Sequence, residues 1–269
     1  MYSYREDSYE IIIDKIKNNP FIVYGAGGHA TKFVQAVEEM GYRHNILGFA
    51  VTENVGNNKK IQVIEAVDRD TFIVIAAHDK NARQMERTLK KLGFQKYISI
   101  YPYLIEICYG EAYQIGETID VDSFLEECKY GNYLAVHYLA IDYIMGNNNI
   151  GKDLYMHVLG NCSNEQTTKQ RWESFSTRVD NYKRGIGFEA YHIKINPQDK
   201  FILDGYHRIC LAKYFGIRKI KADYFNTDIQ KYNSMTFRSM WTDDEIKTWF
   251  SESISKEIIN VRKWILGQG

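Results

Sequence analysis

Residues 201–217 read FILDGYHRICLAKYFGI. The apolar run at the start of this segment predicts a strand, and the spacing of apolar residues after Gly205 predicts a helix. A helix that begins directly after a strand presents unpaired backbone N–H groups, which attract anions. His207 and Arg208 lie in the first turn of that helix. We therefore expect Gly205 and Arg208 to bind a phosphate, with His207 placed for proton transfer.

Asp204 precedes this turn, and its carboxylate suits two catalytic roles, holding a magnesium ion or accepting a proton. The alternative is structural: Asp204 caps the helix, and His207 and Arg208 form an exposed first turn. An arginine at a helix N-terminus opposes the helix dipole, however. A compensating anion is therefore expected beside Arg208.

A helix predicted over residues 165–184 is the candidate second half of this site. It contains the stretch WESFSTR at residues 172–178. Arg178 suits a phosphate contact, and Glu173 suits a general base. These two residues are five positions apart, so they do not share one helix face well. A solvated helix face is the alternative for both.

The N-terminal half contains a second motif, FIVYGAGGHA at residues 21–30. It fits G-x-G-x-x-A between a strand and a helix, the context that a nucleotide-binding turn requires. Gly25, Gly27 and Gly28 allow a ligand to approach the backbone closely, and His29 stands at the helix start. We expect these four residues to bind a nucleotide phosphate. The alternative is a tight turn that binds nothing.

Strands and helices alternate over the first hundred residues, with strands expected at residues 21–24, 45–50, 60–64, 71–77 and 96–101. This alternation with short links predicts a parallel, doubly wound sheet. The fourth strand is expected beside the first, so His78 at its end should lie at the edge that carries the glycine turn. Asp79 is expected to cap the helix that follows.

Beyond residue 105 helices predominate, and we place a domain boundary there. The sequence predicts a capping box at Ser123, a helix over residues 133–145 and one closing helix from Thr242 to Ile265. Between them, strands are expected at residues 191–195, 201–203 and 219–225. The fold expected is α/β: a parallel-sheet domain at residues 1–105, then a helical connector with an α+β domain at residues 106–269.

Composition excludes several classes of protein. The chain has 269 residues with 34 basic and 34 acidic side chains, and no apolar run approaches the length of a membrane span. The basic and acidic counts are 14 and 12 before Ile105, then 20 and 22, so neither half has the positive excess of a nucleic-acid-binding protein. The four cysteines have no metal-binding or redox spacing. We therefore expect a cytoplasmic protein with free thiols and no nucleic-acid partner.

One further stretch, GNNNIGKD at residues 146–153, matches most of a phosphate-binding loop. It has Asp153 where a serine or threonine should hold magnesium. The run before it is helical rather than a strand. A helix ending at Gly146, followed by an Asn-rich loop, explains this stretch without a function.

The DGYHR segment at residues 204–208 resembles the ParB/sulfiredoxin superfamily over about residues 189–225. In that superfamily a strand–Gly–x–x–Arg–helix unit binds nucleotide phosphates, and Asp-Gly-x-His-Arg is most similar to its free-serine-kinase branch. The resemblance implies a role in phosphate or base chemistry for the upstream pair Glu173 and Arg178. Sulfiredoxins have a nucleophilic cysteine where this chain has Tyr206, and partition proteins have a glutamate there.

The N-terminal segment IVYGAGGHA, with ILGF at residues 46–49, is similar to the small Rossmann-like domain of bacterial sugar acyltransferases. The resemblance covers about residues 20–103 and implies that the glycine turn faces a nucleotide sugar. The hexapeptide repeats of those enzymes are absent, so acetyl transfer is not implied.

These features together predict a nucleotide-dependent small-molecule kinase, using ATP and Mg²⁺, that acts on a hydroxylated metabolite or sugar, as in surface-polysaccharide assembly. In that hypothesis Asp204 holds the metal, and Glu173 or His207 takes the hydroxyl proton. A non-catalytic nucleotide- or nucleotide-sugar-binding module is the alternative. A nucleic-acid-associated nucleotide hydrolase is disfavoured by the charge balance. The sequence leaves open whether the protein forms a homodimer.

Overall fold

The computed structural model describes residues 8–53, 61–128, 131–160, 165–186, 192–227 and 241–268. The chain divides into two units, Met1–Glu111 and Ala112–Gly269. Among the residues described, no helix combines the length and the apolar character that crossing a membrane would require.

Unit 1 is built on a five-stranded sheet in which every pair of neighbouring strands is parallel, in the order β3-β2-β1-β4-β5. The prediction of a parallel, doubly wound sheet is confirmed. Its strands are β1 (Phe21–Tyr24), β2 (Ile46–Val51), β3 (Ile61–Val63), β4 (Phe72–Ile75) and β5 (Tyr97–Ser99). Its α-helices are α1 (Tyr9–Asn18), α2 (Gly28–Glu39), α3 (Asp79–Leu92) and α4 (Leu104–Tyr109).

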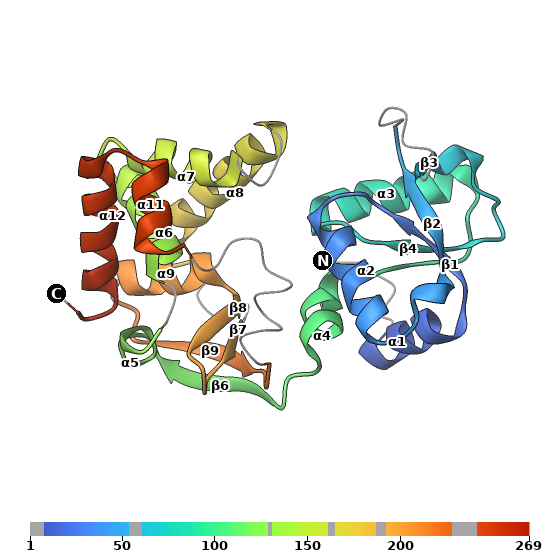
Figure 1. Ribbon diagram of the computed structural model, residues 1–269, viewed down its shortest axis with the longest axis horizontal. Helices are drawn as coiled ribbons and strands as arrows, with labels where there is room; N and C mark the ends of the chain where they lie inside the picture. The colour runs from blue at the N-terminus through green and yellow to red at the C-terminus, as the bar shows by residue number, and fades with distance from the viewer. Residues whose placement is uncertain are drawn as a thin grey trace. The chain divides into compact units, whose positions relative to one another are not determined.

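Helices cover both faces of this sheet, because the central strands are apolar on both sides (Figure 1). Ile22 and Ile73 pack in one buried cluster with Leu89 of α3. Side chains alternate along a strand, so Phe21 points to the other face, where its ring lies 5.9 Å from that of Phe33 on α2. A continuous apolar run is thus explained by burial on two faces.

The start of α3 corrects one expectation. His78, not Asp79, is the N-cap residue, and no side chain caps this helix end. Asp79 is the first helical residue and pairs with Arg83 one turn later, at 2.8 Å between Nη2 and Oδ2. Its carboxylate still lies at the positive end of the helix, where it is favourable.

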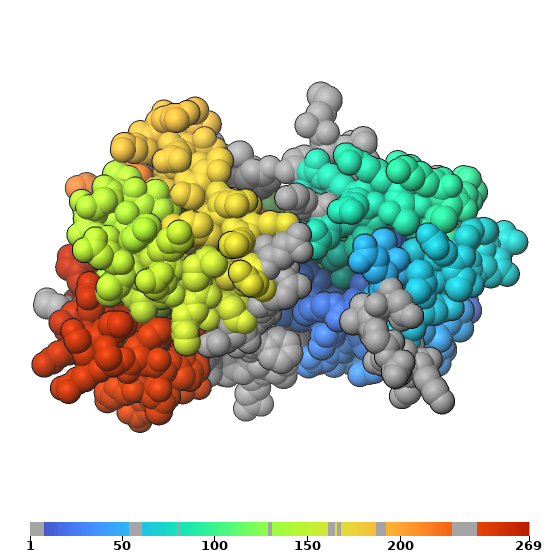
Figure 2. Space-filling model, turned by 90° about the horizontal axis from the view of Figure 1, so that it is seen from above, coloured from blue at the N-terminus to red at the C-terminus, as the bar shows by residue number. Residues whose placement is uncertain are grey.

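Unit 2 has a four-stranded mixed sheet in the order β6-β9-β7-β8, with its helices mostly packed to one side (Figure 1). The strands are β6 (Gln114–Asp120), β7 (Ile193–Asn196), β8 (Phe201–Asp204) and β9 (Lys219–Tyr224). The helices are α5 (Val121–Glu126), α6 (Gly131–Ile144), α7 (Gly151–Gly160), α8 (Glu165–Lys183), α9 (Tyr206–Tyr214), α11 (Asp243–Trp249) and α12 (Glu252–Ile265). In Figure 2, α7 and α8 form one continuous surface of this unit.

Three expectations for this half are corrected by the structure. The N-cap of α5 is Asp120, whose carboxylate accepts the backbone N–H of Ser123 at 3.0 Å, so Ser123 does not open the helix. Strand β6 and helix α7 have no counterpart in the sequence-based expectations. The closing helix is split, because Phe250 is extended and Ser251 caps a new helix, α12.

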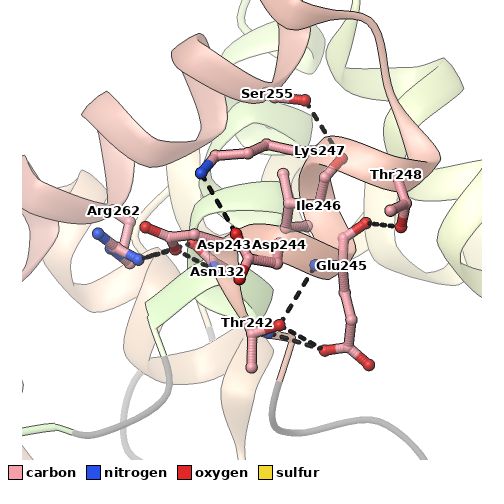
Figure 3. Close-up of polar contacts among 10 residues, drawn as sticks. All are labelled: Asn132, Thr242, Asp243, Asp244, Glu245, Ile246, Lys247, Thr248, Ser255 and Arg262. Atoms are coloured by element: carbon pink, nitrogen blue, oxygen red, sulfur yellow. Dashed lines mark hydrogen bonds and ion pairs between the residues drawn. The ribbon is translucent and has the colours of Figure 1, made fainter.

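A polar joint holds α6, α11 and α12 together (Figure 3). Thr242 and Glu245 form a capping box at the start of α11. Next to it, the Asp243 carboxylate accepts hydrogen bonds from the Arg262 guanidinium of α12 and from the Asn132 amide of α6, the latter at 3.0 Å. Asn132 also donates to the backbone carbonyl of Trp241 at 2.6 Å. This joint fixes the two closing helices on the helical core.

The crossing of α6 and α7 depends on Gly151. A Cβ at Gly151 would lie 2.0 Å from the backbone carbonyl oxygen of Leu139 on α6. Asn148 holds the loop between the helices by accepting the backbone N–H of Gly151 at 2.8 Å and donating to Leu139 O at 2.8 Å. The GNNNIGKD stretch therefore links two helices rather than a strand and a helix.

Gly151→Ala is expected to lower the free energy of unfolding by at least about 2 kcal/mol, because backbone rather than a flexible side chain occupies the space. The matched control is Gly160→Ala at the other end of α7, where a Cβ meets nothing within 4 Å. Urea unfolding of both variants measures the difference. Equal stabilities would show that α6 and α7 do not cross at Gly151.

Candidate functional site

The turn between β8 and α9 fixes the start of α9 against β7. Gly205 is the N-cap residue, with a left-handed φ of +109°, and no side chain caps the helix. A Cβ at Gly205 would lie 2.5 Å from Cγ2 of Ile193 on β7. Asp204 is therefore not the helix cap, and its exposed side chain stands at the end of β8 opposite Lys194.

Arg208 links this helix start to the strand beside it. Its guanidinium donates to the backbone carbonyl of His192, directly before β7. Arg208 and Arg178 of α8 act on the same groups: their positive charges both oppose the rise that burial causes in the pKa of Tyr182. Both arginines expected to bind phosphate therefore lie near Tyr182, although they are on different helices.

The side chain of His207 lies among aromatic rings. Its Nε2 lies 2.9 Å from the Tyr155 hydroxyl, and its ring centroid lies 4.5 Å from that of Phe175 and 4.6 Å from that of His137. Burial lowers its pKa well below the ordinary value, and electrostatic interactions with His137, Arg178, Arg171 and Arg208 lower it further. His207 is therefore a neutral imidazole at neutral pH.

Arg171 is a member of this group that the sequence analysis missed. It lies seven residues before Arg178, with the buried Phe175 between them. Residues three, four and seven apart share one face of a helix, so both arginines flank the buried stripe of α8. The seven-residue spacing from Arg178 could have identified Arg171 in the sequence.

Glu173 is not brought to the same place. It is exposed, and the helical period puts it on the far side of α8 from Arg171 and Arg178. Its backbone carbonyl accepts the Thr177 hydroxyl at 2.9 Å, an ordinary contact within a helix.

No group of three or more His, Cys, Asp or Glu side chains suited to a metal ion occurs among the described residues. Mg²⁺ does not need such a group, because it is usually held by one or two carboxylates together with water and substrate phosphates. The exposed Asp204 carboxylate beside the N-terminus of α9 fits that donor set.

The glycines of the turn in unit 1 differ in whether the fold has room for a side chain. Gly25 has a φ of +132°, and a Cβ there would lie 2.7 Å from the backbone oxygen of Ala76. A Cβ at Gly27 or Gly28 would meet nothing within 4 Å. The fold therefore requires glycine at position 25 only, and the other two glycines leave open space at the N-terminus of α2.

Three rings contact one another near this turn: His29 in the first turn of α2, His78 after β4 and Tyr101 after β5. The His29 centroid lies 5.9 Å from that of His78 and 5.8 Å from that of Tyr101. The Tyr101 hydroxyl lies 3.1 Å from Nε2 of His78. This edge is where the strand order reverses between β1 and β4, the usual ligand position in such sheets.

Comparisons of the chain with known protein families, curated proteins and solved structures give no match. The residues and contacts of these two regions therefore supply all the support for a function.

The lowered pKa of His207 predicts a pH dependence of stability. As the pH falls, the unfolded chain takes up the proton first, at about pH 6.5, while the folded chain resists it. This contribution to the free energy of unfolding is complete above about pH 7.5 and is lost as the pH falls through 6.5.

Between about pH 7.5 and 5.5, the free energy of unfolding should therefore fall more steeply with decreasing pH for the wild type than for His207→Gln. The difference between the two slopes should correspond to the uptake of about one proton on unfolding. Urea unfolding across this range measures both slopes, with His44→Gln, an exposed histidine, as the control. Parallel curves for wild type and His207→Gln would contradict the lowered pKa of His207.

The two parts of the glycine turn predict different mutant behaviour. Gly27→Val should change the free energy of unfolding by no more than about 1 kcal/mol while blocking any ligand at the N-terminus of α2. Gly25→Val should destabilise unit 1 by at least about 2 kcal/mol, through both strain and overlap. Thermal unfolding and ligand titration of both variants test this. If Gly27→Val binds every ligand of the wild type, the turn serves only the fold.

Proposed function

We propose that unit 2 binds the phosphates of a nucleoside triphosphate, such as ATP, at the N-terminus of α9. We propose further that it transfers the terminal phosphoryl group to a hydroxyl group of a small molecule, such as a sugar. The observation that carries this proposal is that α8 packs against α9, so that Arg171 and Arg178 of α8 and Arg208 of α9 all lie near enough to His207 to lower its pKa.

The positive charge of these arginines would complement the negative charge of a phosphate group. Three of the groups that lower the pKa of His207 are arginines, and the backbone N–H groups of the first turn of α9 add the positive end of a helix dipole. Arginine also matches the geometry of phosphate oxygens through paired N–H donors. A triphosphate satisfies these donors better than a single carboxylate, because it supplies several charged oxygens.

Phosphoryl transfer depends mainly on positioning and on charge neutralisation. Arg178 is exposed and suits the outer phosphates, and Arg208 is anchored at the helix start. Asp204 would hold Mg²⁺ against the phosphates, and the metal would neutralise charge on the transferred group. His207 has a positioning role, because its Nε2 is engaged by Tyr155.

A second candidate function rests on unit 1. The open space at Gly27 and Gly28, with the rings of His29, His78 and Tyr101 near the same turn, favours a nucleotide or nucleotide-sugar site at the N-terminus of α2. In this alternative the protein binds its ligand without transferring phosphate.

Asp204→Asn separates the two candidates. The substitution keeps the size of an exposed side chain, so stability should change by no more than about 0.5 kcal/mol. Nucleotide affinity should stay within about tenfold, while Mg²⁺-dependent formation of nucleoside diphosphate should fall at least ~100-fold. The assay measures ADP release with a panel of sugars and hydroxylated metabolites as acceptors. No ADP release by the wild type with any acceptor would overturn the phosphotransferase proposal.

Arg178→Ala should weaken the binding of a non-hydrolysable ATP analogue by at least about tenfold, because a charged contact to phosphate is lost. The matched control is Arg184→Ala, an exposed arginine that follows the end of α8. Isothermal titration calorimetry measures both affinities. Equal affinities for the two variants would remove Arg178 from the site.

A further inference from the structure

His192 and Asp223 form a hydrogen-bonded pair that the proposed mechanism has not used. His192 directly precedes β7, Asp223 lies in β9, and Nδ1 of the imidazole is 2.7 Å from Oδ1 of the carboxylate. The side chain of His192 is 34% exposed, whereas that of Asp223 is 16% exposed. The pair therefore has a sheltered carboxylate and an imidazole that solvent or a substrate can reach.

The carboxylate of this pair is held from the neighbouring strand. The backbone N–H of Gly116 in β6 donates to Oδ1 of Asp223 at 2.9 Å. Lys221 in turn donates to the carbonyl of Gly116 at 2.9 Å and to the Thr118 hydroxyl at 2.8 Å. Gly116 has a φ of +72°, and a Cβ there would lie 3.1 Å from Cε1 of His192. Glycine at position 116, in the bulge of β6, lets the backbone N–H contact Asp223 without a steric overlap with the imidazole of His192.

The pair lies next to the start of α9. Arg208 donates to the carbonyl of His192, so one residue touches both the pair and the helix N-terminus. On the sheet, Lys194 is the partner of Asp204 on one side and of Asp223 on the other. Two inter-strand spacings separate the backbones of these two acids, about 10 Å. The proposal below requires the acceptor molecule to span this distance between a nucleotide at α9 and the pair.

The contact to Asp223 determines the chemistry of His192. A carboxylate at Nδ1 favours the tautomer with the proton on Nδ1, which leaves the lone pair of Nε2 for a proton from a substrate. The two other candidate bases are less suited: Nε2 of His207 is engaged by Tyr155, and Glu173 lies on the far side of α8.

We propose that His192 is the general base of the phosphoryl transfer proposed above, and that Asp223 is its positioning residue. This inference rests on the proposed function. The proton of the acceptor hydroxyl passes to Nε2 of His192 while the acceptor oxygen bonds to the terminal phosphorus of the triphosphate. The bond from that phosphorus to the bridging oxygen breaks, which releases the nucleoside diphosphate. The imidazolium then returns its proton to solvent.

The central test is the kinetics of His192→Ala and His192→Asn. Asparagine can still donate to Asp223 but cannot act as a base, so it keeps the fold if alanine does not. Both variants should lower kcat at least ~100-fold and leave KM for ATP within about threefold. Added imidazole should restore part of the activity of His192→Ala. The control, His44→Ala, should behave as the wild type.

Asp223→Asn tests the positioning role. Its kcat should fall by at least about tenfold with little change in KM for ATP. In ¹⁵N–¹H correlation spectra at neutral pH, His192 of the wild type should carry its proton on Nδ1, and Asp223→Asn should shift this tautomer balance.

The outcomes separate this inference from the proposed function. If both His192 variants keep the turnover of the wild type within about threefold, His192 is not the general base, and the proposed phosphoryl transfer is unaffected. A wild type that releases no ADP would overturn both. Loss of activity without imidazole rescue, together with an Nε2-protonated His192 in the wild type, would overturn the role of the pair.

Discussion

The geometry of unit 2 depends on the close approach of Gly205 to Ile193. A Cβ at position 205 would lie 2.7 Å from Cβ of Ile193, so the chain can turn from β8 into α9 here only without a side chain. The left-handed φ of Gly205 adds the same requirement. Because this turn is tight, the first turn of α9 lies directly on β7. Arg208 then reaches the carbonyl of His192, and His207 enters the aromatic cluster beside Tyr155. The fold alone thus explains the glycine at position 205. The proposal of a ligand rests instead on the arginines near the start of α9.

The elements that the sequence predicts are those with a strong local pattern. The strands of unit 1 are apolar on both faces, and a left-handed glycine such as Gly93 ends a helix clearly. Strand β6 was missed because it is an edge strand, and among its residues only Ile119 is buried, so alternation is weak. The break between α11 and α12 was missed because apolar residues continue through it at helical spacing, and only Ser251 marks the new start.

The candidate site was predictable where it follows a turn and unpredictable where it depends on strand pairing. Arg208 stands out in sequence because a helix must begin just before it, and Arg171 is recoverable from its helical spacing to Arg178. His192 and Asp223 are 31 residues apart and meet only because β7 and β9 pair in parallel. That register is a long-range property of the sheet, which no local pattern encodes. Helical spacing alone separates Glu173 from Arg171 and Arg178, but it cannot show which of these two faces α8 turns toward the rest of unit 2, because that depends on packing.

The most direct test of the proposed phosphate site at α9 is hydrogen–deuterium exchange measured by mass spectrometry, with and without Mg²⁺ and a non-hydrolysable ATP analogue. Phosphate bound at the start of α9 should slow exchange of the backbone amides at residues 205–207, because they would donate directly to it. Residues 171–178 of α8 should be protected as well, as their arginines become ordered. Unchanged exchange in both segments, or protection confined to residues 25–30 of unit 1, would contradict a nucleotide site in unit 2.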